Sequence, residues 1–286
     1  MLDQSQTNSK NQAAASTTKP SISELKSKLK ATWSDGDYDT FSRPMAAGAV
    51  IVVEQWGITS GEKVLDVACG SGQTAIPSAK RGAIVTGIDI ADNTIEAAKK
   101  RAAEEGVKAD FSVGDAEEMS FNDGFFDVII SMFGAMFAPR PDKVVEEFAR
   151  VCRQGGRIHM ANWTPQGMVG KMFKIIGGHV PPPNMPSPLL WGDEDTITKR
   201  LETDFSDIKL NRVFYPSFTY PFGANELVDF FREHYGPVKR AFGVLDKKGQ
   251  AELRSELIEN FEAHNAATDG TLDLRAEFLN VTAIRK

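Results

Sequence analysis

The segment between residues 63 and 89 constrains the fold of this chain more than any other. A short apolar run at residues 64–67 is typical of a strand that is buried on both faces. It ends at Gly70-Ser71-Gly72, after which residues 73–80 have the composition of a helix, and a second apolar run ends at Asp89. The order strand, glycine turn, helix and strand predicts a nucleotide-binding α/β unit, because such a turn lets a ligand approach free backbone N–H groups closely.

The carboxylate of Asp66 separates the cofactors that such a turn can hold. The spacing Gly70-x-Gly72-x-x-Ala75 also fits the dinucleotide fingerprint, so the glycines alone leave the cofactor open. Asp66 stands at the end of the first strand, where its charge would repel a pyrophosphate and attract a cationic ammonium group. S-adenosylmethionine has such an ammonium, a ribose for Asp89 and no phosphate. The sequence therefore favours S-adenosylmethionine over a dinucleotide.

Four segments together resemble the motifs of class I S-adenosylmethionine-dependent methyltransferases. Residues 66–72 resemble their first motif, and residues 114–117 resemble the adenine-contacting turn after their third strand. Residues 126–131 resemble their fourth strand, and residues 150–157 the turn before the fifth. The match extends over roughly residues 33–163, with Gln154 where proline is usual, which affects the stiffness of the turn and not the chemistry.

This resemblance implies a Rossmann-like, doubly wound α/β fold with a seven-stranded sheet, an antiparallel last strand and a helical cap. It implies S-adenosyl-L-methionine as the cofactor and S-adenosyl-L-homocysteine as its product. Asp89 is expected to bind the ribose, Asp115 the exocyclic amine of adenine, and Tyr38 the methionine carboxylate or the sulfonium. The expected cofactor-binding residues are Tyr38, Asp66, Ala68, Gly70, Gly72, Asp89, Ile90, Asp115, Ala116 and Ser131. Tyr38 has the alternative role of packing a helix onto the domain, and Asp115 that of a simple cap.

Four regions are expected along the chain. Residues 1–20 are polar and predicted to be disordered, and residues 21–58 form an N-terminal helical lid. In the second region, Ser21 and Glu24 predict a capping box. Residues 59–163 form the cofactor-binding core, and residues 164–286 form a helical cap, or substrate region, together with the last two strands of the sheet.

The cap is rich in aromatic residues, which indicates a lipophilic acceptor. Residues 131–134, directly after the fourth strand, read Ser-Met-Phe-Gly and lack the Asn/Asp-Pro-Pro-aromatic motif of amino-DNA methyltransferases. The same aromatic residues are also suited to be the cap's own core. The expected substrate-pocket residues are Phe133, Met136, Trp163, Trp191, Phe231 and Tyr235.

Two histidines are candidates for a general base. His179, before a run of prolines, and His234, beside Tyr235, both fall in the cap, where they could reach an acceptor. His159 falls inside a predicted strand and is expected to be structural, and His264 falls on a charged helix. An electron-rich carbon as acceptor would require no strong base.

Composition excludes several classes of function. The net charge of −6 is spread along the chain without a basic run, so no nucleic-acid partner is expected, and Lys26 and its neighbours are expected to form a solvated face. No apolar run approaches the roughly 20 residues of a membrane span, and residues 1–20 lack a secretory signal, which predicts a cytoplasmic protein. Two cysteines predict neither a disulfide framework nor a zinc site, and no metal is expected. The predicted partner is a small-molecule acceptor, and a homo-oligomer is left open.

The sequence thus predicts methyl transfer from S-adenosylmethionine to a small lipophilic or aromatic metabolite at a carbon, oxygen or nitrogen atom. Quinone C-methyltransferases are the nearest alternative in the core motifs, although their N-terminal segment is not matched. Two alternatives of other classes are a dinucleotide-dependent oxidoreductase and a non-catalytic cofactor-binding module.

Overall fold

The sheet at the centre of the molecule has seven strands in the order β3-β2-β1-β4-β5-β9-β6, in a computed structural model that describes residues 20–182 and 184–286. The strands are β1 (Lys63–Val67), β2 (Ile84–Asp89), β3 (Asp110–Val113), β4 (Phe126–Met132), β5 (Cys152–Trp163), β6 (Phe205–Phe214) and β9 (Glu277–Arg285). The strands from β3 to β5 are parallel, whereas β9 is antiparallel to both of its neighbours. This confirms the predicted doubly wound sheet with an antiparallel last strand.

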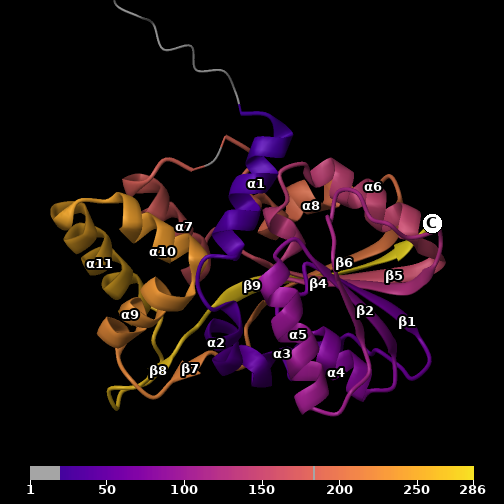
Figure 1. Cartoon of the computed structure of the whole chain (residues 1–286), viewed down its shortest axis with the longest axis horizontal. Coiled ribbons are helices and arrows are strands. Elements are labelled where there is room, and N and C mark those ends of the chain that lie inside the picture. The colour runs from indigo at the N-terminus through magenta and orange to yellow at the C-terminus, as the bar shows by residue number, and fades with distance from the viewer. Residues whose placement is uncertain (1–19, 183) are drawn as a thin grey trace, which may run out of the picture.

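Helices cover both faces of the sheet (Figure 1). One face carries α3 (Ala46–Gln55), α4 (Ala75–Lys80) and α5 (Asp92–Glu104), and the other carries α6 (Pro141–Val151) and α8 (Glu194–Leu201). Val64, Leu65 and Val67 of β1 have no exposed surface, as expected for a strand covered on both sides.

Residues 188–201 differ from the expectation that they belong to the cap. The short helix η3 (Pro188–Gly192) packs against β5, and α8 packs against β6 and α6. Ile197 and Leu201 of α8 are fully buried there. The apolar side of α8 is therefore used to cover the sheet and is not available to the cap.

The cap consists of α7 (Met168–His179), α9 (Ala224–His234), α10 (Gly236–Val244) and α11 (Lys247–Glu262), beside a small sheet of β7 (Thr219–Tyr220) and β8 (Leu272–Asp273) (Figure 1). No helix was predicted over the residues of α10, which begins with Gly236-Pro237. Proline is tolerated in the first helical turn, where its missing N–H would have no intrahelical partner. Within the described part of the chain, no helix combines the length and apolar character needed to cross a membrane.

The N-terminal helices α1 (Ile22–Trp33) and α2 (Tyr38–Ser42), with the 3-10 helix η1 (Arg43–Met45), lie between the core and the cap (Figure 1). The capping box predicted from Ser21 and Glu24 is present at the start of α1. On the core side Lys26 contacts Asp115 at 2.5 Å, and on the cap side Asp35 contacts Lys239 at 3.1 Å. Lys26 is therefore not part of a solvated face: its side chain is 18% exposed, because a carboxylate distant in the sequence meets it.

Two glycines allow the end of α1 to approach the cap at backbone distance. Gly36 has a φ of +117°, and a Cβ there would lie 2.5 Å from the carbonyl oxygen of His234. A Cβ at Gly236, the first residue of α10, would overlap the carbonyl oxygen of Thr32. The position of α1 therefore depends on the absence of side chains at two separate points of the chain.

We expect Gly236→Ala to destabilise the protein by about 1–3 kcal/mol, because the added methyl group must displace the backbone of Thr32. Gly243→Ala, in the same helix, is the matched control, since a Cβ there meets no atom within 4 Å. It should be neutral or stabilise by up to about 1 kcal/mol, as alanine replaces glycine inside a helix. Urea unfolding measures both values, and hydrogen exchange of α1 should become faster only in Gly236→Ala. Equal stability of the two variants would contradict this account of α1.

Candidate functional site

The carboxyl ends of β1 and β4 meet where the direction of the strand order reverses, which is the place where open α/β sheets bind ligands. The residues that follow these strands have left-handed backbones, with a φ of 57° at Ala68 and 56° at Phe133. A Cβ at Gly134 would lie 2.5 Å from the carbonyl oxygen of Ala68, so the two loops are in contact. Such strain at two non-glycine residues in one crevice indicates a functional site.

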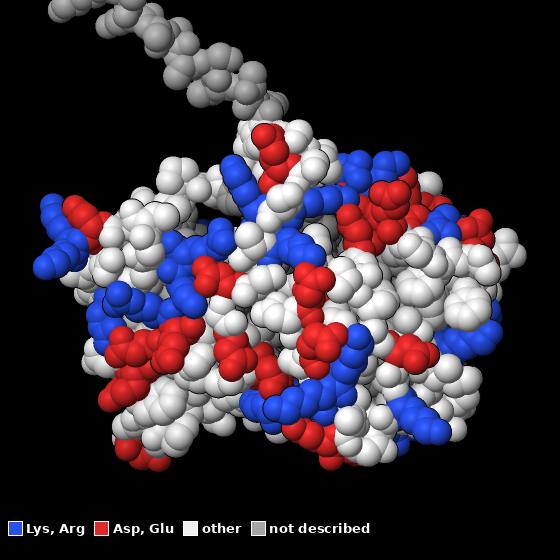
Figure 2. Space-filling model, in the orientation of Figure 1, with Lys and Arg blue, Asp and Glu red and all other residues white. Residues whose placement is uncertain are grey.

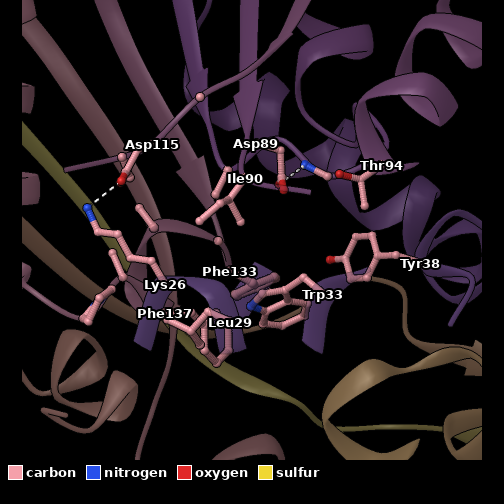
Figure 3. A pocket seen from close by; sticks show the side chains of 18 residues that line it. Lys26, Leu29, Trp33, Tyr38, Asp89, Ile90, Thr94, Asp115, Phe133 and Phe137 are labelled. Carbon is pink, nitrogen blue, oxygen red and sulfur yellow. Dashed lines mark hydrogen bonds and ion pairs between the residues drawn. The ribbon is translucent and has the colours of Figure 1, made fainter. Parts of the chain in front are cut away.

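A cavity opens at this crevice between the edge of the sheet and α1 (Figure 3). Its floor comes from the loops after β1, β2, β3 and β4, and α1 covers it with three residues. Of the ten predicted cofactor-binding residues, the structure brings together Tyr38, Ala68, Gly70, Asp89, Ile90, Asp115 and Ala116 in the lining. The lining also contains residues that the sequence did not predict to bind the cofactor, chiefly Lys26, Leu29, Trp33, Thr94, Gly134 and Phe137.

Asp89 joins the end of β2 to the glycine turn. One carboxylate oxygen accepts a hydrogen bond from the backbone N–H of Gly70 at 2.9 Å, and the other accepts one from Ala91, also at 2.9 Å. Burial raises the pKa of Asp89, and these N–H donors act in the opposite direction. Each oxygen has a second lone pair, so the carboxylate can also accept hydrogen bonds from the two hydroxyls of a ribose.

The glycine turn itself provides room for an aromatic ring. Gly70 has a φ of +54°, and a Cβ there would lie 2.8 Å from a ring carbon of Tyr38. Gly72 has a φ of +83° and lies under the turn, where a Cβ would be 3.1 Å from the side chain of Ile76. Gly70 therefore contributes to the cavity directly, and Gly72 through the shape of the turn.

Asp66 lies beneath the turn and not in the lining of the cavity. It has no exposed surface, and one carboxylate oxygen accepts a hydrogen bond from the hydroxyl of Thr74 at 2.7 Å. The other oxygen, Oδ1, is buried without a hydrogen-bond partner among the described residues. Burial raises the pKa of Asp66 to about 7. An unpartnered carboxylate oxygen next to the turn is suited to a cationic group, although the structure places it deeper than the sequence suggested.

Ser131 supports the crevice from within. Its hydroxyl donates to the carbonyl oxygen of Val67 at 2.8 Å and accepts from the N–H of Ala135 at 3.0 Å. The residue is 1% exposed and does not line the cavity. It links the end of β1 to the 3-10 helix η2 (Ala135–Phe137), which carries Phe137 into the lining.

Asp115 is held at the far end of the cavity by a charged network that includes Lys26 (Figure 3). One of its oxygens accepts from the N–H of Glu117 at 2.9 Å, and the other pairs with the Lys26 ammonium. The same ammonium lies 2.7 Å from the fully buried side chain of Glu117, which also binds Arg140 at 2.8 Å. The α1 residues of the lining could have been predicted from the sequence, because Lys26, Leu29 and Trp33 recur on one face of a helix.

A second, apolar chamber adjoins the cavity. The two share Trp33, Tyr38 and Phe133. The ring of Phe133 stacks on Trp163 with a centroid distance of 3.6 Å and an interplanar angle of 7°. The full lining is Trp33, Tyr38, Phe41, Met45, Phe133, Trp163, Val169, Met172, Phe218, Phe231 and Tyr235.

Four of the six predicted substrate-pocket residues line this chamber, namely Phe133, Trp163, Phe231 and Tyr235. Met136 and Trp191 do not, and each is only 1% exposed. Trp191 is covered by the guanidinium of Arg200 from α8, 4.9 Å from its ring. The expectation for these two residues is corrected: both belong to the buried core, because the elements that carry them, η2 and η3, pack them among other apolar residues.

The two candidate bases lie elsewhere. The Nε2 atom of His179 is 3.1 Å from a carboxylate oxygen of Glu256, between α7 and α11. His234, at the end of α9, packs its ring 4.9 Å from Phe230. Neither lines the cavity or the chamber, so neither is placed to remove a proton from a bound acceptor.

The chain has similar sequences among known proteins. A family model described as a methyltransferase domain matches residues 65–160. The chain is 39% identical to the uncharacterized protein Rv1403c of Mycobacterium tuberculosis over 234 residues, which cover 79% of this chain and 84% of that protein. It is 33% identical over 262 residues to Rv1405c of the same organism, also uncharacterized, covering 90% and 94% of the two chains. Methyltransferase GfsG of Streptomyces halstedii is 36% identical over 126 residues, covering 43% and 45%.

Solved structures share the fold. The YcgJ protein of Bacillus subtilis superposes with a TM-score of 0.57 at 18% identity, covering 84% of this chain and 98% of that one. Phosphoethanolamine N-methyltransferase 2 of Haemonchus contortus, solved with phosphomonomethylethanolamine and S-adenosylhomocysteine, gives a TM-score of 0.59 at 17% identity, covering 93% and 60%. At these identities the likeness concerns the fold.

Asp66→Asn should remove a pH dependence of stability that the buried carboxyl creates. Its pKa is about 7 in the folded chain and about 3.9 in an unfolded one. Between these values the folded chain keeps a proton that the unfolded chain releases, so the stability contributed by this group falls as the pH rises from about 4 to about 7. The free energy of unfolding of the variant, relative to wild type, should therefore rise by roughly 1–3 kcal/mol between about pH 5 and about pH 7. Urea unfolding measures it, and a difference that does not vary with pH would refute the prediction.

Proposed function

This chain belongs to the class I S-adenosylmethionine-dependent methyltransferases, and we propose that it methylates a small lipophilic or aromatic acceptor held in the apolar chamber. The observation that carries this proposal is the shared wall of Trp33, Tyr38 and Phe133 between the cofactor cavity and the chamber. A molecule in the chamber is thereby next to the cofactor while being surrounded by aromatic and aliphatic side chains.

The residues of the cavity suit the parts of S-adenosylmethionine in order. In this proposal Asp89 accepts hydrogen bonds from the ribose hydroxyls and Asp115 from the adenine amine, both from the lining of the cavity, and the buried Oδ1 atom of Asp66 attracts the ammonium. The faces of Tyr38 and Phe133 would favour a neighbouring cation. When bound, the cofactor supplies an electrophilic methyl group on a sulfonium, which is transferred by in-line displacement.

The chamber aligns the acceptor and excludes water, and it offers no strong base. Among the described residues that line it, none is acidic, basic or a histidine. Burial raises the pKa of the Tyr38 and Tyr235 phenols, so at neutral pH their hydroxyls act as hydrogen-bond donors and not as bases. These features favour an acceptor that is already nucleophilic, such as an electron-rich ring carbon or an acidic phenol.

The direct test is transfer of a radiolabelled methyl group to a panel of lipophilic phenols, hydroquinones and aliphatic amines. We expect product from the phenols or hydroquinones, and Trp163→Ala should lower turnover by about tenfold or more, since it removes the ring that supports Phe133. Trp191→Ala is not a suitable control because it would destabilise the core, so exposed Phe125→Ala serves instead. Labelling of the amines alone would overturn the proposed acceptor class.

Asp89→Asn should weaken the binding of S-adenosylhomocysteine by about tenfold to a hundredfold, because charge-assisted hydrogen bonds become neutral ones. Asp92→Asn is the control, since this exposed carboxylate pairs only with the exposed Lys30 at the surface of the lid. Titration calorimetry gives both affinities. If Asp89→Asn binds as tightly as wild type, this carboxylate has no role in holding the cofactor.

A further inference from the structure

A groove runs along the outer side of α1 and is separate from the chamber. It is bounded by α1, α7, α10 and residues 181–182 and 185–189, and α1, α7 and α10 lie side by side in Figure 1. Its walls are mostly apolar, with Phe173, Ile176, Val180, Met185, Ala241 and Val244 among them. Val244 is 70% exposed, which is unusual for a large apolar residue and shows that the groove is open to solvent.

The groove adjoins both parts of the site through single side chains. Trp33 lines the cofactor cavity, the chamber and the groove, and Phe137 lines the cavity and the groove. The rings of Trp33 and Phe137 are 4.8 Å apart, and Phe173 continues the series 5.6 Å from Phe137. One aromatic layer thus lies between the groove and the cavity, so a molecule in the groove is one side chain away from the reaction centre.

The charges in the groove have one sign. Lys174 of α7 and Arg240 of α10 lie in its lining, and no acidic residue does among the described residues. Arg240 has only a long contact of 3.5 Å with Asp35, and the Lys174 side chain belongs to an exposed residue. Basic side chains gather over α10 and α1 on the face shown in Figure 2. An apolar surface with two cations at its walls complements an apolar chain that ends in an anion.

We propose that the acceptor is an amphiphile longer than the chamber, with an apolar chain that lies in this groove and a carboxylate that Lys174 and Arg240 bind. The proposal rests on the proposed function, because it assumes that the reactive end of the molecule occupies the chamber. It assigns to the groove the selection of acceptors by length and terminal charge. Methyl transfer then occurs at the end of the molecule remote from the carboxylate.

Two adjacent glycines of α7 give a matched steric test. Gly177 lines the groove and Gly178 does not, while a Cβ at either position meets no atom within 4 Å. Gly177→Phe should fill the groove without straining the helix, and Gly178→Phe should place the same ring in solvent. The probe is 11-(dansylamino)undecanoic acid, whose fluorescence reports binding to an apolar surface, in the presence of S-adenosylhomocysteine. Gly177→Phe should weaken its binding by about tenfold or more, and Gly178→Phe should leave it within about twofold.

The charge is tested with the methyl ester of the same probe. Lys174→Glu should weaken binding of the acid by about fivefold to tenfold and leave that of the ester unchanged. Lys171→Glu, on the same helix beside His264 and outside the groove, should affect neither. Equal loss of acid and ester in Lys174→Glu would overturn the role of the charge.

Calorimetry with S-adenosylhomocysteine on each variant separates the two proposals. If the wild-type protein does not bind S-adenosylhomocysteine, the proposed function fails. If it does, and the probe either does not bind or binds equally to Gly177→Phe and Gly178→Phe, the groove has no such role and the proposed function stands.

Discussion

A buried carboxylate bonded to the backbone of a glycine turn is the interaction on which the site depends. A carboxylate oxygen of Asp89 accepts a hydrogen bond from the backbone N–H of Gly70 at 2.9 Å, which links the turn after β1 to the end of β2. Hydrogen bonds to charged groups contribute about 1.5–3 kcal/mol, so this contact is strong enough to define the loop. Because Gly70 has no side chain, Tyr38 rests on the turn, and through Tyr38 the lid adopts its position above the cavity. The floor of the cavity and the contact of Tyr38 with it thus depend on one anchored turn.

The lid is attached by polar contacts at its two sides and by buried apolar residues, among them Leu25 and Phe41. Exposed ion pairs such as that of Lys30 with Asp92 contribute at most about 1 kcal/mol each. The less exposed contact of Lys26 has a chemical consequence, because Lys26 occupies an oxygen of Asp115 that an adenine amine would also use. If Asp115 binds the adenine amine as proposed, binding of the cofactor and attachment of α1 are linked at this carboxylate.

The sequence predicted those features that depend on residues close together in the chain. The strand, glycine turn and acidic residue between Val64 and Asp89 are a local pattern, and the capping box at Ser21 is another. The prediction that Lys26 lies on a solvated face was wrong because its partner Asp115 is 89 residues away, and no local sequence pattern indicates such a pair. The helix α10 was not predicted, and its start shows that proline is compatible with the first helical turn.

The direction in which a side chain points was harder to predict than the place of its residue in the fold. Asp66 was placed correctly at the end of β1, yet its side chain points beneath the turn to Thr74 and not into the cavity. The prediction of Trp191 as a substrate-pocket residue depends on its aromatic character, and that of Met136 on its apolar character and its place after the fourth strand; core residues share both properties. Which of the two a residue becomes depends on the turn of η2 or η3 that carries it, and this follows from tertiary packing.

Charged side chains lie on one side of Trp33 and an apolar chamber lies on the other, and this separation determines what each part of the site can do. On one side are the carboxylates of Asp89 and Asp115, the latter paired with Lys26, and on the other is a chamber without a charged side chain among its described lining residues. In methyl transfer from a sulfonium, positive charge disperses as the methyl group leaves, so fixed anions favour the bound reactant more than the transition state. In the proposed function the carboxylates therefore serve the affinity for the cofactor. Turnover would then depend on how the apolar walls align an acceptor that needs no base from the protein, so we expect the shape of the chamber, and not a titratable residue, to set the rate.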